Sequence, residues 1–257
     1  MSSGKKRNLP HNDSSDPTFR GGLEGLNCDL GEGMNNDALI MPFITSANIA
    51  CGYHAGDEKT IWQTIELAVQ YKVKPGAHVS FLDKKNFGRQ EMNLPAAEIY
   101  ELVQQQLIIF KELADSFDIK PNHVKPHGAL YNMSARDATI AKCIANAVKD
   151  FDASLIVYGL SGSHSVSEAK AVGLKTASEV FADRTYRDDG SLTPRSQPNA
   201  LIEDAEKVVK QVLQMIHEGT VTTVSGKTIP IVAETICIHG DGKHAVEFAK
   251  AVHSAVF

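Results

Sequence analysis

The stretch Leu26-Asn27-Cys28-Asp29-Leu30-Gly31-Glu32 introduces a pattern that runs through this 257-residue chain. A short, mainly apolar segment ends in carboxylates and a glycine, and a segment with helical spacing lies further along. Similar short segments recur, and together they predict seven strands. Their predicted ranges are 26–30, 46–51, 75–79, 123–126, 155–158, 176–181 and 235–238.

Helices are predicted between these strands, where apolar residues lie three and four positions apart. Asp57 is expected to cap a helix with an apolar face from Ile61 to Val69, and Pro95 to occupy the first turn of the next helix. Further apolar stripes cover residues 140–148, 201–216 and 246–252. Such repeated alternation of strand and helix implies a parallel sheet with right-handed crossovers.

Two regions depart from this alternation. Residues 219–231 predict a surface hairpin turning at Gly226, and Val221 excludes a Walker phosphate loop because a glycine would be required at that position. Residues 1–22 are polar and predict a flexible N-terminal extension, followed by one domain over residues 23–257.

Ionisable and amide side chains collect at the carboxyl ends of six of the seven predicted strands. A (β/α) barrel builds its active site at that face from several strands, whereas a doubly wound sheet binds ligands mainly at one switch point. The pattern therefore predicts an α/β fold with a closed, TIM-like barrel and one pocket. The residues are Asp29, Glu32, Asn48, His54, Asp57, His78, Lys125, His127, Glu179, Asp183, Arg184, His239 and Asp241.

Lys125 is the member of this set for which a structural explanation is hardest to find. It lies between Val124 and Pro126, and a lysine in such an apolar setting needs a partner. His123 and His127 resemble a helical metal-binding pair, but extended backbone would separate them by about 13 Å. They are therefore not expected to share an ion, and the chain must bend at Pro126 for Lys125 and His127 both to reach the pocket.

The other candidate metal ligands leave the question of a bound ion open. Some of Asp29, His54 and His78 could hold a mononuclear divalent metal. Cys51 and His54 could offer a thiolate and an imidazole, but a four-ligand zinc site needs more than one such pair.

The composition argues against several classes of protein. The 26 lysines and arginines against 31 aspartates and glutamates give a net charge of −5, which disfavours nucleic-acid and anionic-membrane binding. No stretch approaches the roughly 20 apolar residues of a membrane span, and no signal peptide is visible. The four cysteines are scattered, so we expect a reduced, cytoplasmic protein. They are Cys28, Cys51, Cys143 and Cys237.

Six motifs resemble those of the LamB/YcsF lactam-utilisation family, in order, from residue 26 to the C-terminus. They are LNCDLGE at 26–32, SANIACGYHAGD at 46–57, HVKPHGALYN at 123–132, EVFADR at 179–184, DGSLTPR at 189–195 and CIHGD at 237–241. The resemblance implies a distorted seven-stranded barrel related to the glycoside hydrolase/deacetylase barrels. It also implies the A subunit of an ATP-dependent 5-oxoprolinase, which opens 5-oxoproline to L-glutamate with companion subunits B and C.

The implied reaction suggests roles for the pocket residues. ATP, with Mg²⁺, would phosphorylate the lactam oxygen, and a base would then activate water. The base candidates are Asp29, Glu179 and His54, while Lys125 and His127 would stabilise charge on oxygen or protonate nitrogen. Arg184 and Arg195 suit the substrate carboxylate or a phosphate. The further substrate-binding candidates are Glu32, Asn48, His78, His239 and Asp241.

Two other functions remain open at this point: a stand-alone, metal-dependent amide or N-acetyl-sugar hydrolase of the deacetylase type, and a non-catalytic subunit that hands the lactam to kinase-type partners. A homo-oligomer is also an expectation. The chain departs from the family pattern at Val79 and Gln90, where the family has proline and arginine, and this leaves room for a different lactam.

Overall fold

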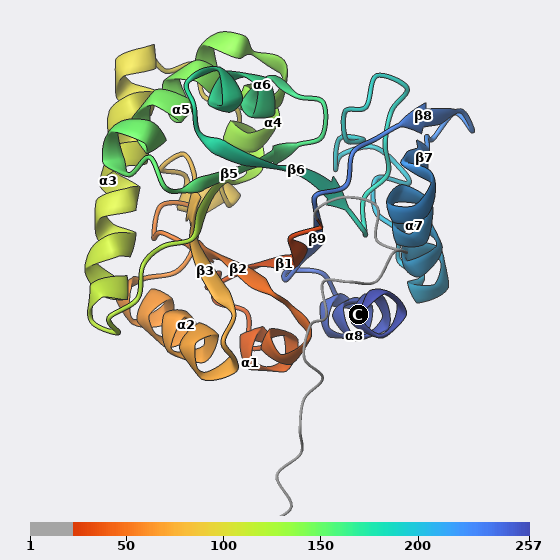
Figure 1. The fold of residues 1–257 in the computed structure, drawn as a ribbon, viewed down its shortest axis with the longest axis horizontal. Helices are drawn as coiled ribbons and strands as arrows, with labels where there is room; N and C mark the ends of the chain where they lie inside the picture. The colour runs from red at the N-terminus through yellow and green to blue at the C-terminus, as the bar shows by residue number, and fades with distance from the viewer. Residues whose placement is uncertain (1–22) are drawn as a thin grey trace, which may run out of the picture.

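Seven buried segments pair in parallel and close on themselves, because β9 pairs with both β1 and β6 (Figure 1). The computed structural model describes residues 23–257. The order around the barrel is β1-β2-β3-β4-β5-β6-β9. The strands are β1 (Gly25–Leu30), β2 (Ser46–Ala50), β3 (Lys74–Val79), β4 (His123–Pro126), β5 (Ile156–Leu160), β6 (Lys175–Phe181) and β9 (Thr235–His239).

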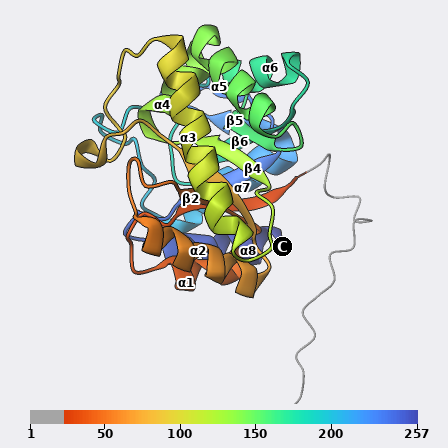
Figure 2. The same cartoon turned by 90° about the vertical axis from the view of Figure 1, so that its left-hand side faces the viewer.

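Helices cover the outside of the barrel, and α3 lies along one side of it (Figure 2). Their apolar faces pack against the strands, which buries both layers. The helices are α1 (Asp37–Ile40), α2 (Glu58–Tyr71), α3 (Ala96–Asp115), α4 (Gly128–Arg136), α5 (Ala138–Phe151), α6 (His164–Ala171), α7 (Ala205–Glu218) and α8 (Ala245–Val256), with 3-10 turns η1 (Met41–Phe43) and η2 (Lys84–Asn86).

The predicted barrel is confirmed, and each predicted strand lies within two residues of an observed one. The predicted hairpin is also confirmed as β7 (Thr220–Thr222) paired antiparallel with β8 (Thr228–Pro230). Asp57 caps α2 by accepting a hydrogen bond from the Thr60 backbone N–H. The predicted extension over residues 1–22 lies outside the described part of the chain.

Two details of the helix prediction are wrong. The apolar stripe predicts Leu201 and Ile202 on a helix, but α7 begins only at Ala205, where the Asp204 side chain accepts a hydrogen bond from the Lys207 N–H. This cap ends the preceding loop, and Leu201 instead forms an isolated bridge with Arg184. Pro95 precedes α3 as its N-cap rather than lying in its first turn.

A polar network fills part of the barrel interior. Asn48 donates to Asn27 Oδ1 at 2.7 Å, and His123 Nε2 donates to Asn48 Oδ1 at 2.7 Å. The His123 ring stacks on Tyr158 with 4.1 Å between ring centroids. Burial, followed by the charge on Lys125, lowers the pKa of His123 to about 3, so this histidine is neutral. Its hydrogen bonds make it a part of the core.

Gly76 on β3 leaves the space that the His123 ring occupies. A Cβ at position 76 would overlap three atoms of that ring. We therefore expect Gly76→Ala to lower the free energy of unfolding by about 1–3 kcal/mol, measured in urea. Gly242→Ala is the matched control, since its nearest new contact is an ordinary 3.5 Å. Equal stabilities of the two variants would contradict this account of the interior.

Among residues 23–257, no helix has the length and apolar character that crossing a membrane requires.

Candidate functional site

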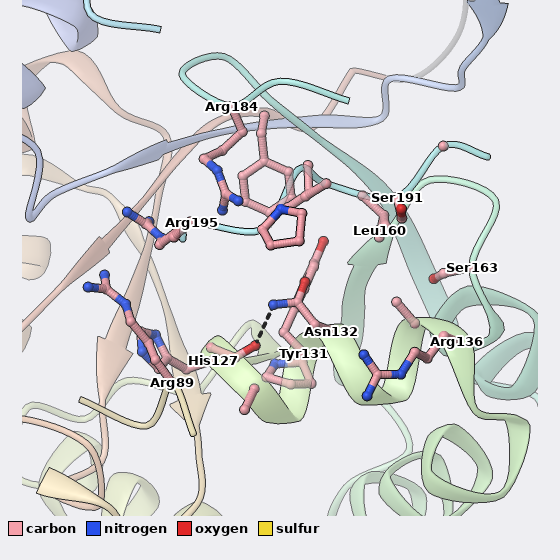
Figure 3. Close-up of a pocket in the computed structure, with 18 of the residues that line it drawn as sticks. Arg89, His127, Tyr131, Asn132, Arg136, Leu160, Ser163, Arg184, Ser191 and Arg195 are labelled. Atoms are coloured by element: carbon pink, nitrogen blue, oxygen red, sulfur yellow. Dashed lines mark hydrogen bonds between the residues drawn. The ribbon is translucent and has the colours of Figure 1, made fainter. Parts of the chain in front are cut away.

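A cavity of about 700 Å³ opens at the carboxyl ends of the strands, as predicted for a barrel. It is large enough for a small-molecule ligand. Figure 3 shows part of its wall, including Tyr131 and Asn132 from α4 and Arg184 and Arg195 from the segment between β6 and α7. Of the predicted site residues, those that line it are Asp29, His78, Lys125, His127, Arg184, Arg195 and His239.

Lys125 lies in a buried cluster of charged groups at the floor of this cavity. Its Nζ is 2.8 Å from Asp29 Oδ1, 2.9 Å from Glu179 Oε1 and 3.0 Å from Cys237 Sγ. These atoms come from β4, β1, β6 and β9, so barrel closure is what brings them together. The prediction that Lys125 needs a partner is confirmed, because the carboxylates of Asp29 and Glu179 both pair with it.

The charge states in this cluster follow from the neighbours. Burial alone would raise the pKa of Asp29, but His78 and Lys125 outweigh it and hold that pKa well below its usual range. Burial alone would lower the pKa of Lys125, but Asp29, Cys237 and Glu179 raise it well above its usual value. Asp29 is thus a carboxylate and Lys125 an ammonium. Only the carboxylate can accept a proton.

Asn48 lies beneath Asp29, out of the cavity. It is fully buried and donates to Asp29 Oδ1 at 2.8 Å. Asn48 is a substrate-binding candidate from the sequence. Its buried position instead lets it hold the Asp29 carboxylate in place.

Three histidines and a glutamate form a second buried group beside Asp29, which we call the histidine cluster: Glu32, His54, His78 and His127. One ligand atom from each lies within 4.8 Å of all the others. His127 follows β4 directly, so the expected bend after Pro126 does bring it and Lys125 to the same pocket. Two of the three metal-ligand candidates from the sequence, His54 and His78, belong to the cluster.

Burial changes the pKa of three members of this cluster. Burial and the neighbouring His78 lower the pKa of His54 well below its usual value. Burial, with His54 and His78, does the same to the pKa of His127. Burial and then the Asp29 charge raise the pKa of Glu32. The surroundings therefore disfavour an unpaired charge on His54, His127 or Glu32.

Five arginines lie on the cavity wall, although the chain as a whole is acidic. Arg184 is held in place, donating to the Thr193 and Ala200 carbonyl oxygens at 2.6 and 3.3 Å. Burial and nearby Arg195 lower its pKa to about 10. Arg89, from the loop after β3, pairs with Asp241. The wall arginines are Arg89, Arg136, Arg184, Arg187 and Arg195.

Arg195 is the arginine best placed for a ligand. Figure 3 shows it on the same side of the cavity as Arg89 and Arg184, away from Arg136. Within residues 23–257, no carboxylate lies within ion-pair distance of its guanidinium, whereas Arg89 and Arg136 pair with Asp241 and Glu91. Such a wall suits an anionic ligand.

His239 lines the cavity and is fixed by Asp183. Its Nδ1 is 2.9 Å from Asp183 Oδ1, and its backbone N–H donates to the same carboxylate at 3.2 Å. Although burial acts in the opposite direction, His239 keeps the pKa of Asp183 below its usual value. Asp183 is therefore a support for His239.

Several cavity residues were not predicted from the sequence. Tyr131 and Asn132 are on α4, a helix too short to show a clear apolar stripe, although both fall in one of the six family motifs. Arg89 follows η2, outside any strand end. Val79 and Gln90, the two departures from the family pattern, are not among the residues lining the cavity.

Comparison with known proteins places this barrel in a family. The family model described as LamB/YcsF matches residues 25–257. The chain belongs to the LamB/YcsF family. It is 50% identical over 236 residues to the 5-oxoprolinase A subunit of Tolumonas auensis, covering 90% of this chain and 94% of that protein. It is 52% identical over 232 residues to the 5-oxoprolinase A subunit of Staphylococcus carnosus, covering 88% and 92%.

A solved structure supports the same placement of this LamB/YcsF chain. The lactam utilization protein from Thermus thermophilus superimposes with a TM-score of 0.85 at 38% identity, covering 91% of this chain and 96% of that one. The similarity therefore extends over nearly the whole barrel.

Proposed function

We propose that this chain is the A subunit of a 5-oxoprolinase and that its cavity binds the lactam. The observation that carries the proposal is the identity of about half of all residues, along nearly the whole length, to proteins of that name. The cavity supports it, since the arginine wall suits the carboxylate of 5-oxoproline.

Opening a lactam requires an electrophilic carbonyl carbon, a base for the attacking water and a proton for the departing nitrogen. Asp29 is the base in this proposal, because it is ionised, lines the cavity and is fixed by Lys125 and Asn48. Lys125 directs its protons toward Asp29, Glu179 and Cys237, so it positions the carboxylates and supplies positive charge near the reacting oxygen.

ATP enters as the co-substrate that activates the carbonyl, together with Mg²⁺. The cavity is far larger than one five-membered lactam needs, and its arginines also suit a phosphate. Since the sequence carries no Walker loop at Gly226, we propose that companion subunits B and C take part in the ATP chemistry.

Glutamate release from 5-oxoproline tests the proposal, using this chain alone and with subunits B and C, with and without ATP. We expect release only in the complete mixture with ATP. Release by the chain alone without ATP would instead support a stand-alone hydrolase. Lactam binding with no release in any mixture would support a non-catalytic binding subunit.

Arg195→Ala is expected to raise KM for 5-oxoproline about 10- to 100-fold with little change in kcat. The reason is that a charge-assisted hydrogen bond to a carboxylate contributes about 1.5–3 kcal/mol. Steady-state kinetics of the assembled enzyme measure both constants. Arg136→Ala is the comparison, since Arg136 pairs with Glu91 and lies across the cavity. A larger effect of Arg136→Ala would contradict the placement of the carboxylate.

A further inference from the structure

The proton positions in the histidine cluster carry a further inference. His78 Nδ1 lies 2.9 Å from the Lys125 carbonyl oxygen, and His127 Nε2 lies 2.9 Å from the Phe87 carbonyl oxygen. A carbonyl oxygen only accepts hydrogen bonds, so each of these nitrogens carries the ring proton. The other nitrogen of each ring, His78 Nε2 and His127 Nδ1, then lies on the side of the cluster.

These two remaining nitrogens lie next to each other. His78 Nε2 and His127 Nδ1 are 2.9 Å apart. An imidazole nitrogen in such a position is a common ligand for a divalent metal. The Glu32 carboxylate oxygen Oε1 lies close by, 3.5 Å from His127 Nδ1 and 3.1 Å from His54 Nε2. Four ligand atoms thus lie within 4.8 Å of one another.

We infer that the histidine cluster is a binding site for one first-row divalent cation of the zinc type, held by His54, His78, His127 and Glu32. A zinc ion at about 2.0–2.1 Å from each of four tetrahedral ligands would set those ligands about 3.3 Å apart. The distance from His78 to His127 and the three distances from Glu32 to the histidines span 2.9 to 4.0 Å, which brackets that separation, and every other pair of ligand atoms lies within 4.8 Å.

The surroundings are those of a metal site. Histidine ligands of metals usually donate their other N–H to a carbonyl or carboxylate, as His78 and His127 do. All four side chains are buried, and His78 and His127 border the cavity, which gives an ion a way in. The Asp29 carboxylate lies 3.3 Å from His78 Nε2 and adds negative charge.

A second acidic group in the cavity shows the contrast. Asp29, Cys237 and His239 also offer ligand atoms within 4.8 Å of one another. There, however, Lys125 Nζ already supplies the positive charge, at 2.8 Å from Asp29 and 3.0 Å from Cys237. The histidine cluster has no such ammonium within ion-pair distance of Glu32 among the described residues. The histidine cluster is therefore the better place for a cation from solution.

The site does not depend on the proposed function. An ion beside Asp29 would polarise a carbonyl or phosphoryl oxygen, and only this role toward the lactam rests on the proposed function. Metal content and glutamate release are separate measurements, so either part can fail while the other holds.

The test is the metal content of the full-length chain without an affinity tag. The protein is equilibrated with Zn²⁺, separated from free metal by gel filtration, and analysed by inductively coupled plasma mass spectrometry. We expect one Zn²⁺ per chain, and at least a 10-fold weaker affinity in His78→Ala and in His127→Ala. His217→Gln, an exposed histidine on α7, is the matched control and should retain the ion.

A second measurement covers the case in which the alanine variants fold poorly. Co²⁺ bound by the wild-type chain should give the intense visible absorption of a four-coordinate ion, and Zn²⁺ should raise its Tm. Wild-type protein that binds neither ion stoichiometrically would overturn the inference, as would equal zinc content in the wild type and both alanine variants.

Discussion

Lys125→Ala is expected to abolish glutamate release by the assembled enzyme. The ammonium is the shared partner of Asp29 and Glu179, and its loss leaves two buried carboxylates without their cation. Their mutual repulsion favours protonation, which removes the base that the proposed reaction needs. Turnover is measured as glutamate formed per folded chain, with the folded fraction taken from near-ultraviolet circular dichroism.

The same substitution is expected to lower the free energy of unfolding by about 3–5 kcal/mol, because it breaks a buried ion pair by removing one partner. Lys111→Ala is the matched control, since Lys111 forms an exposed pair with Asp115 on α3 and should change neither quantity. Undiminished turnover in folded Lys125→Ala would remove Lys125 from the site.

Asp29→Asn is expected to lower kcat about 10²- to 10⁴-fold, which is the range for loss of a general base. The amide has nearly the volume of the carboxylate but cannot accept a proton from water, so the fold should survive while the chemistry does not. Steady-state kinetics at saturating lactam and ATP measure the change.

The control for this prediction is Asp115→Asn, an exposed carboxylate far from the cavity on α3. A kcat for Asp29→Asn within a few-fold of the wild type would show that Asp29 only pairs with Lys125. Glu179, the other carboxylate on Lys125, would then be the next base to test.

The barrel and its pocket could be predicted because parallel strands present their carboxyl ends at one face. Polar residues such as Asp29, Lys125 and His239 end strands that are far apart in the sequence, and closure of the sheet gathers them. The sequence could predict that Lys125 needs a partner but not which residue that partner is, because its identity depends on which strands are neighbours around the barrel.

The rest of the site depends on local geometry that the sequence does not express. The extended backbone of β4 keeps His123 out of the histidine cluster, as the sequence predicts. His127 lies beside His54 and Glu32 because of the loops after β1 and β2, and no hydrophobic periodicity describes the paths of those loops. Leu201 continues the apolar stripe of α7 but lies beyond the Asp204 cap, because an apolar residue can equally pack from an extended segment. The spacing of apolar residues alone therefore does not distinguish a helical from an extended segment at Leu201.

A crystal structure of the chain with 5-oxoproline tests the central claim most directly, because the claim assigns a place to the lactam. The account predicts density in the cavity above Lys125, with the lactam carbonyl near Asp29 and the carboxylate within hydrogen-bond distance of Arg195. Density for the lactam outside this cavity, or a carboxylate directed away from the arginine wall, would contradict it.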